Sequence, residues 1–264
     1  NDLPLTDHTP GYGSAAKYLA VTMGEIIRDT SIYAVPAVTI VEIMGRNAGW
    51  LTLAAALPRF VGGAKPDIVA IPEVPFDENE FLRKVQEAHR RSPNVVAVVS
   101  EGIRDKSGTY VGSQTKSGVV DTFGHTYLSG VGKYLECLVT EKIGCKVRSI
   151  ELNLMQRCSS HLASFQDLEE GFAIGQESVA AALRGESGKM VAVQRLSNTP
   201  YAIRLNTVEV ADVANREQLV PEKWWDLEDA GVQAEICRYI LPLIKGEVPQ
   251  FKNEFGLNDY IIFE

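Results

Sequence analysis

The sequence predicts an α/β fold in which parallel sheets are covered by helices on both faces. Two observations lead to this prediction. Short β-branched runs alternate with helical patterns along most of the chain, and this order favours parallel strands joined by helices. The run Asn94–Val99 (NVVAVV) is almost wholly apolar, which is typical of a strand buried on both faces of its sheet.

The individual elements are predicted from periodicity and from their end signals. Asp77 precedes an apolar helical pattern with Glu80 three residues later, which is an N-cap and capping-box signature. The stretch 104–126 is rich in Gly, Ser and Thr, which favours a surface loop. We expect helices over 49–57, 78–90, 128–143, 167–183 and 233–244, and strands over 38–43, 67–71, 94–99 and 146–155, with 190–194 and 201–205 pairing across the turn 197–200.

Composition narrows the class of protein. The chain has 264 residues, of which 45% are hydrophobic and 23% charged, and its net charge is −8. A negative chain of this kind has no general attraction for nucleic acid or an anionic membrane, and it has no run of 18 apolar residues. Its four cysteines show no metal-binding spacing and are expected to be reduced, as in a cytoplasmic protein: Cys137, Cys145, Cys158 and Cys237.

Polar residues follow the predicted strands at the points where the strands end. In an open parallel sheet, ligands collect at the carboxyl ends of the strands. There the sequence places Met44-Gly45-Arg46, Pro72-Glu73, Ser100-Glu101-Gly102 and Gln156-Arg157. We therefore expect two arginines and two glutamates to converge on one rim.

This set of side chains suits a sugar phosphate better than a nicotinamide or a metal. Arginine binds phosphate in a bidentate manner, and carboxylates accept hydrogen bonds from sugar hydroxyls. Each residue alone also has an ordinary structural explanation: Arg46 as a surface residue, Met44 as core, Glu101 as a loop or cap residue. Their convergence favours the ligand site.

The stretch Gly11–Ala16 fits the pattern G-x-G-x-x-A of a dinucleotide-binding loop. That fingerprint needs a preceding strand, and Asn1–Pro10 is too polar and too rich in proline to be one. We interpret Gly11–Ala16 instead as the start of a helix, at which Gly11 and Gly13 allow a phosphate to approach closely.

Several segments together resemble the phosphofructokinase family, and their motif wording is closest to its pyrophosphate-dependent members. The resemblance runs from residue 1 to about residue 210 and is weaker beyond. The segments match in the family's order: Asn1–Leu3 and Thr6–Gly11, which resemble the end of the T-I-D-N-D motif and the stretch after it; Ile40–Thr52, which contains M-G-R; Val69–Val74; Ser100–Gly102; and Gln156-Arg157.

The resemblance implies a role for each matching residue. Met44, Gly45 and Arg46 would bind fructose 6-phosphate, and Arg46 would also stabilise the phosphoryl group in transfer. Glu101 would bind the sugar and Arg157 its 6-phosphate. Asp2 would assist the catalytic aspartate, and Arg148 would reach the active site of a neighbouring subunit. Leu154 stands where many ATP-dependent relatives have a histidine.

By the same resemblance, the protein is a phosphotransferase that moves a phosphoryl group from pyrophosphate or ATP to the 1-hydroxyl of fructose 6-phosphate, giving fructose 1,6-bisphosphate in glycolysis. Its proton acceptor, its donor loops and the ligands of its Mg²⁺ cofactor would lie before Asn1, so we expect this chain alone to be inactive. A non-catalytic sugar-phosphate-binding or regulatory subunit is the alternative.

The resemblance also implies a two-lobed, Rossmann-like architecture and a homo-oligomer, dimer or tetramer. Residues 1–12 would connect from a donor lobe, 13–155 would form the fructose-6-phosphate lobe, 156–210 would belong to the donor lobe and 211–264 would be a C-terminal extension. If the predicted strand 146–155 is continuous, Arg148 and Arg157 lie roughly 30 Å apart, too far to grip one sugar phosphate.

Overall fold

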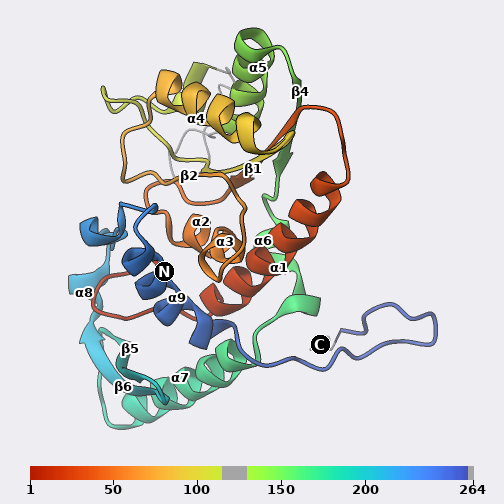
Figure 1. Cartoon of the computed structure of the whole chain (residues 1–264). Helices are drawn as coiled ribbons and strands as arrows, with labels where there is room; N and C mark the ends of the chain where they lie inside the picture. The colour runs from red at the N-terminus through yellow and green to blue at the C-terminus, as the bar shows by residue number, and fades with distance from the viewer. Residues whose placement is uncertain (115–129, 261–264) are drawn as a thin grey trace.

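Four parallel strands organise the structure. The computed structural model describes residues 1–114 and 130–260, and Figure 1 shows the sheet in its upper part. The strands lie in the order β2-β3-β1-β4, and all three pairings are parallel. Their bounds are Ala37–Ile43 for β1, Ile68–Ala70 for β2, Asn94–Ser100 for β3 and Lys146–Glu151 for β4.

Helices cover both faces of this sheet. Side chains of a strand alternate between the two faces, so Val38 and Ile40 of β1 pack with α4 (Glu78–Arg91) and α5 (Val131–Ile143). Val41 and Ile43 point the other way, toward the apolar side of α1 (Tyr12–Ser31) and the end of α2 (Trp50–Ala55). The predicted α/β fold with a helix-covered parallel sheet is therefore confirmed.

A second, smaller sheet lies at the opposite end of the molecule (Figure 1). It is an antiparallel hairpin of β5 (Lys189–Asn198) and β6 (Tyr201–Glu209), and α7 (Phe165–Leu183) packs on it. The sequence predicted this pairing, although the strands are longer than the predicted 190–194 and 201–205.

Residues near the C-terminus complete a third apolar cluster between α1, α2 and α9 (Ala230–Ile240). Trp50, Trp224 and Tyr239 form its aromatic centre, with ring centroids 5.5–6.0 Å apart. Short helical elements fill the rest of the described chain: α3 (Leu57–Phe60), α6 (Met155–Cys158), α8 (Val210–Val213) and 3₁₀ turns at Val111–Gln114, Ser160–Leu162, Glu222–Trp224 and Leu241–Ile244.

Some predicted boundaries are wrong. The strand predicted over 146–155 ends at Glu151, because Asn153 adopts a positive φ of 35° and α6 begins at Met155. The estimate of roughly 30 Å between Arg148 and Arg157 assumed a continuous strand and has no basis in the structure. The final helix begins at Ala230 rather than 233, because the side chain of Asp229 caps it.

Other boundaries hold, and some lie outside the described residues. The side chain of Asp77 accepts a hydrogen bond from the backbone N–H of Glu80, which confirms the predicted N-cap of α4. The predicted helix 49–57 is present as α2 and α3. The second half of the loop predicted over 104–126 and the first residues of the helix predicted over 128–143 are not described.

The helix that the sequence placed after Gly11 is present as α1, but the phosphate expected at its start is not supported. The carboxylate of Asp167 accepts hydrogen bonds from the backbone N–H groups of Gly11 (2.8 Å) and Ser14 (3.1 Å). A Cβ at Gly13 would lie 2.5 Å from the carbonyl oxygen of Leu243. Gly13 therefore leaves room for the side chain of Asp167 and for the backbone at Leu243, both from this same chain.

The helices of the described residues provide no candidate for a membrane span. Within residues 1–114 and 130–260, none of them combines the length and the apolar character that crossing a bilayer requires.

Two glycines of α1 provide a test of this packing. Gly13→Ala should lower the free energy of unfolding by about 1–3 kcal/mol, because the added methyl group overlaps the backbone at Leu243. Gly24→Ala, in the same helix with no atom within 4 Å of the added methyl group, should raise it by about 0.5–1 kcal/mol. Urea denaturation near pH 7 measures both, and destabilisation of equal size in the two variants would contradict the packing at Gly13.

Candidate functional site

The loop Met44–Arg46 leaves β1 at its carboxyl end and is held by two other predicted segments. The backbone N–H of Met44 donates to Oε1 of Gln156 at 3.2 Å, and that of Gly45 donates to Oε1 of Glu101 at 3.1 Å. Gly45 has φ +146°, and a Cβ there would lie 2.6 Å from the carbonyl oxygen of Ala48, so the loop depends on glycine. The segments after β1, β3 and β4 thus meet on one rim, as predicted.

The backbone of Arg46 lies directly against Gly102. A Cβ at Gly102 would overlap the carbonyl carbon and oxygen of Arg46. The hydroxyl of Ser100 donates to the carbonyl oxygen of Gly45, and the backbone N–H of Glu101 donates to the carbonyl oxygen of Ile43 at 2.9 Å. The end of β3 therefore fixes the backbone that carries Arg46.

Glu101 is a half-buried carboxylate in this arrangement. Burial raises its pKa above the usual range, while the N–H of Gly45 and the charge of Arg46 act in the opposite direction. A carboxylate that already orients the loop and stands beside an arginine is suited to accept hydrogen bonds from ligand hydroxyls.

The two other predicted arginines differ in position. Arg157 is exposed on α6 and follows Gln156, which is buried against the loop. Arg148 is exposed on the edge strand β4 and pairs with Thr39, four residues before the end of β1 at Ile43. At about 3.3 Å per residue, that places Arg148 roughly 13 Å back along the sheet from the rim of its own chain.

Asp2 is linked to the same rim through residues near the C-terminus. Its carbonyl oxygen accepts a hydrogen bond of 2.6 Å from the N–H of Gln218, whose own carbonyl oxygen accepts one of 2.8 Å from Nε1 of Trp50. Next to Arg46, Nδ2 of Asn47 donates to Oε1 of Glu217 at 2.6 Å. Residues 217–218 therefore connect the Asp2 segment to the start of α2, a link that sequence reasoning missed.

Arg104 was also missed, since it stands four residues beyond the end of β3. Its guanidinium donates to Oδ1 of Asn47 at 2.8 Å and lies 4.2 Å from the ring centroid of Tyr110. It brings a further positive charge to Asn47, the residue next to Arg46 in the chain, and only the contact with Asn47 reveals it.

Glu73 does not belong to the rim, and the expectation that it contributes a ligand carboxylate is wrong. Its Oε1 accepts hydrogen bonds from the backbone N–H groups of Gly49 and Val220, both at 2.9 Å, and its Oε2 is buried. Burial raises its pKa. The carboxylate ties the end of β2 to the start of α2 and to the C-terminal region.

The described residues do not include a group of three or more His, Cys, Asp or Glu side chains arranged to hold a metal ion. The residues at the rim therefore do not form a set of ligands that fits Mg²⁺, and none of them is given a role in binding this ion.

Comparison with known proteins gives the family. Residues 1–181 match the family model described as "Phosphofructokinase". The chain belongs to the phosphofructokinase family. Two similar members are named pyrophosphate–fructose 6-phosphate 1-phosphotransferase. The one from Halomonas elongata is 38% identical to this chain, over 96% of this chain and 60% of the relative. The one from Xanthomonas campestris is also 38% identical, over 99% of this chain and 62% of the relative.

The solved structures agree with this membership. A phosphofructokinase of Nitrosospira multiformis, titled as pyrophosphate-dependent, superimposes with a TM-score of 0.82 at 31% identity, covering 99% of this chain and 62% of that one. The chain therefore has the phosphofructokinase fold, and it spans about 60% of the length of the relatives it matches.

Near this rim, Glu42 is a buried carboxyl that the sequence did not single out. It lies on β1 and its Oε2 accepts a hydrogen bond of 2.6 Å from the N–H of Gly132. Burial, and more weakly the charges of Glu151 and Glu101, raise its pKa to about 7 despite that hydrogen bond. Glu42 therefore changes charge near neutral pH, two residues before Met44.

This titration predicts a pH-dependent effect of Glu42→Gln. The folded protein binds a proton at Glu42 between the ordinary pKa of 4.5 and about 7, so the wild type loses stability as pH rises through that window. The variant should match the wild type near pH 4 and exceed its free energy of unfolding by on the order of 2–3 kcal/mol near pH 8. Denaturant unfolding at both pH values measures this.

Glu141→Gln, an exposed residue of α5, serves as the control and should change stability by less than about 0.5 kcal/mol at either pH. If Glu42→Gln shifts stability equally at both pH values, Glu42 does not titrate in this window.

Proposed function

We propose that the full-length protein transfers a phosphoryl group from pyrophosphate to the 1-hydroxyl of fructose 6-phosphate, giving fructose 1,6-bisphosphate. The observation that carries the proposal is the loop Met44–Arg46, hydrogen-bonded to Glu101 and Gln156 at the carboxyl edge of the parallel sheet. This loop and its partners fit a sugar phosphate, and relatives that are 38% identical over almost the whole chain are named for this reaction. Fructose 6-phosphate, pyrophosphate, a homo-oligomeric assembly and a cytoplasmic location are part of the same proposal.

Each residue has a distinct part in this reaction. Met44 and Gly45 bind the sugar, Glu101 accepts hydrogen bonds from its hydroxyls, and Arg157 holds the 6-phosphate. Arg46 faces the charge that spreads over the phosphoryl group in transit, which is where electrostatic stabilisation contributes most. Asp2 assists the group that takes the proton from the 1-hydroxyl. Mg²⁺ would accompany the donor and would supply neutralisation of its phosphate charge, and the rim residues of this chain would not hold it.

The direct test is turnover of fructose 6-phosphate by the full-length protein with Mg²⁺ and either pyrophosphate or ATP. Turnover with pyrophosphate at a kcat/KM well above that with ATP supports the proposal, and preference for ATP overturns the choice of donor. A protein that binds fructose 6-phosphate but turns it over with neither donor would be the non-catalytic, regulatory alternative.

Arg46 and Arg157 should affect different kinetic constants. Arg46→Ala should lower kcat by about 10³–10⁵, the range for arginines that contact a transferring phosphoryl group. Arg157→Ala should mainly raise the KM for fructose 6-phosphate, because it binds a phosphate that does not react. Steady-state kinetics of both variants distinguish the roles, with Arg90→Ala on the exposed side of α4 as the control. The reverse pattern would mean that the two roles are exchanged.

Arg148 should serve the active site of a neighbouring subunit, because it lies on an exposed edge strand and away from the rim of its own chain. Two inactive variants, Arg148→Ala and Arg46→Ala, are dissociated, mixed and reassembled. A hybrid dimer has one site in which both arginines are intact, so activity should return. Hybrid dimers that form and stay inactive would rule out the shared site.

A further inference from the structure

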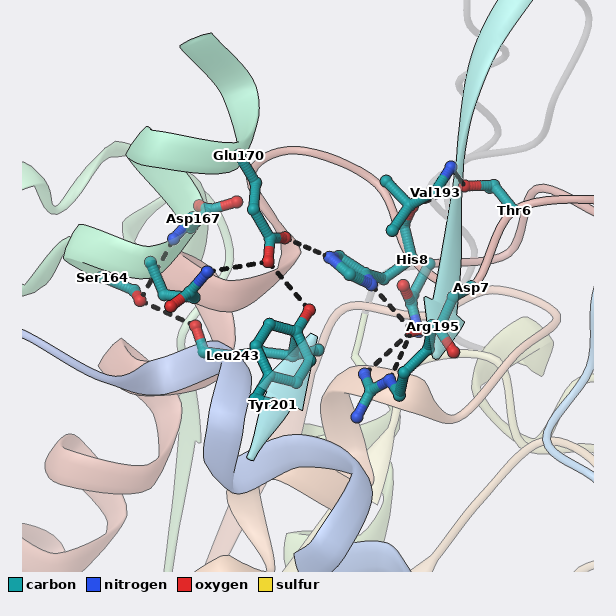
Figure 2. A network of polar contacts seen from close by, with 12 residues as sticks. Thr6, Asp7, His8, Ser164, Asp167, Glu170, Val193, Arg195, Tyr201 and Leu243 are labelled. Atoms are coloured by element: carbon teal, nitrogen blue, oxygen red, sulfur yellow. Dashed lines mark hydrogen bonds and ion pairs between the residues drawn. The ribbon is translucent and has the colours of Figure 1, made fainter. Parts of the chain in front are cut away.

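A buried histidine near the start of the chain is held between two carboxylates. The ring of His8 is 3% exposed. Its Nδ1 lies 2.8 Å from Oδ2 of Asp7, and its Nε2 lies 2.5 Å from Oε2 of Glu170 on α7. Figure 2 shows the ring between the two acids, with Arg195 and Tyr201 on either side.

Both ring nitrogens must donate in this geometry. Ionised carboxylates only accept hydrogen bonds, so an imidazole that contacts one on each side carries both protons. Burial alone would lower the pKa of His8, but the hydrogen bonds and charges of Asp7 and Glu170 raise it. Burial alone would raise the pKa of Asp7 and Glu170, but His8, and for Asp7 also Arg195, lower both.

The four charged side chains of the cluster, His8, Asp7, Glu170 and Arg195, sum to no net charge, and their hydrogen-bond partners come from several elements. Arg195 of β5 donates to Oδ2 of Asp7 from Nε (3.0 Å) and from the guanidinium (2.8 Å). Tyr201 of β6 donates its hydroxyl to Oε1 of Glu170 at 2.8 Å, which also accepts from Nε2 of Gln166 at 2.9 Å. Tyr239 of α9 donates to the carbonyl oxygen of Asp7 at 2.6 Å. Burial raises the pKa of both tyrosines, so they stay neutral.

The backbone around His8 is bonded to the hairpin. The N–H of Asp7 donates to the carbonyl oxygen of Val193 at 2.8 Å, and the N–H of Val193 donates to Oγ1 of Thr6 at 2.9 Å. Oγ1 of Thr6 in turn donates to the carbonyl oxygen of His8 at 2.9 Å. Residues 6–8 are therefore fixed to β5 and, through Glu170, to α7.

A strained turn separates this anchor from Asp2. Leu5 has φ +65°, a conformation that a leucine rarely adopts, and its side chain is 55% exposed, so packing of that side chain does not explain it. Beyond the turn, the carbonyl oxygen of Asp2 is bonded to Gln218. A strained residue persists where its surroundings fix the chain on both sides, and here residues 6–8 and Gln218 do so.

We propose that His8 is a positioning residue: clamped as an imidazolium between Asp7 and Glu170, it holds the Leu5 turn and thereby the placement of Asp2 for phosphoryl transfer. This rests on the proposed function, since it assigns Asp2 to the reaction. His8 itself is buried and does not touch substrate. The clamp is complete only while the ring carries both protons, so its effect on Asp2 depends on pH.

Kinetics of the full-length protein test the positioning role. His8→Gln should lower kcat by about 10²-fold, the cost of misplacing a reacting group by an ångström, and leave the KM for fructose 6-phosphate within about twofold, because the loop Met44–Arg46 is not part of the clamp. His89→Gln is the matched control and should leave both constants unchanged. His89 is half-buried on α4, and its ring nitrogens have no hydrogen-bond partner among the residues that the structure describes. An unchanged kcat in His8→Gln, or a change confined to KM, would overturn the proposal.

Two further variants separate positioning from loss of folding. Glu170→Gln removes one charge from the clamp but keeps its shape, so the alkaline limb of the kcat profile should move to lower pH. Leu5→Gly removes the strain of the positive φ, so adding it to His8→Gln should recover kcat several-fold per folded molecule. A role confined to stability would leave the pH profile in place and give no recovery, and either result would overturn the proposal.

The charge state of His8 is measured independently of activity by ¹⁵N NMR of the ring nitrogens, assigned with His8→Gln. Both nitrogens should remain protonated well above the ordinary pKa of about 6.5. A ring that is neutral at pH 7 overturns the clamp, even if the protein proves to be the proposed phosphotransferase. A doubly protonated ring in a protein without turnover would leave the clamp intact and overturn the assigned reaction.

Discussion

The contact between the backbone of Arg46 and Gly102 is the constraint on which the rest of the site depends. The two strands β1 and β3 are neighbours in the sheet, so the loops after them must pass each other within a few ångströms. Glycine at 45 and 102 makes this possible. Once the loops are that close, Glu101 reaches the N–H of Gly45 and Ser100 reaches its carbonyl oxygen. The rim that we propose for a sugar phosphate is therefore a consequence of strand order and of two positions without a side chain.

The region near the C-terminus acts as a second layer behind that rim. Glu217, Gln218 and Val220 bond to Asn47, Asp2 and Glu73 respectively, and the aromatic cluster around Trp50 covers them. Two of these three contacts use backbone N–H groups, which every residue other than proline provides. Such contacts leave no mark in the sequence, which explains why residues 211–264 suggested only an extension.

Sequence reasoning succeeded where one strong local signal sufficed. The alternation of β-branched runs with helical patterns, the almost wholly apolar run of β3 and the cap at Asp77 identified the sheet and α4. Sequence reasoning failed where contacts between distant parts of the chain determine the local structure. Asp167, distant in the sequence, occupies the start of α1, and the end of β4 depends on the backbone of Asn153. Glu73 and Glu101 both follow a strand, so the sequence does not distinguish them. Only their backbone partners do: the carboxylate of Glu73 bonds to Gly49 and Val220 and is structural, whereas that of Glu101 bonds to Gly45 at the rim.

The charges of the molecule fall into two kinds with different consequences. Surface pairs such as Arg83 with Glu80 are exposed on α4 and contribute little, about 0–1 kcal/mol each. The cluster around His8 is buried, so removing its charges from water costs several kcal/mol per ion. Apolar side chains of similar size would give such a core at lower cost, which makes stability a poor reason for the cluster. Apolar packing has no direction, whereas hydrogen bonds between fixed charges do, so the cluster can set the orientation of the short segment at residues 6–8. That segment leads directly to Asp2.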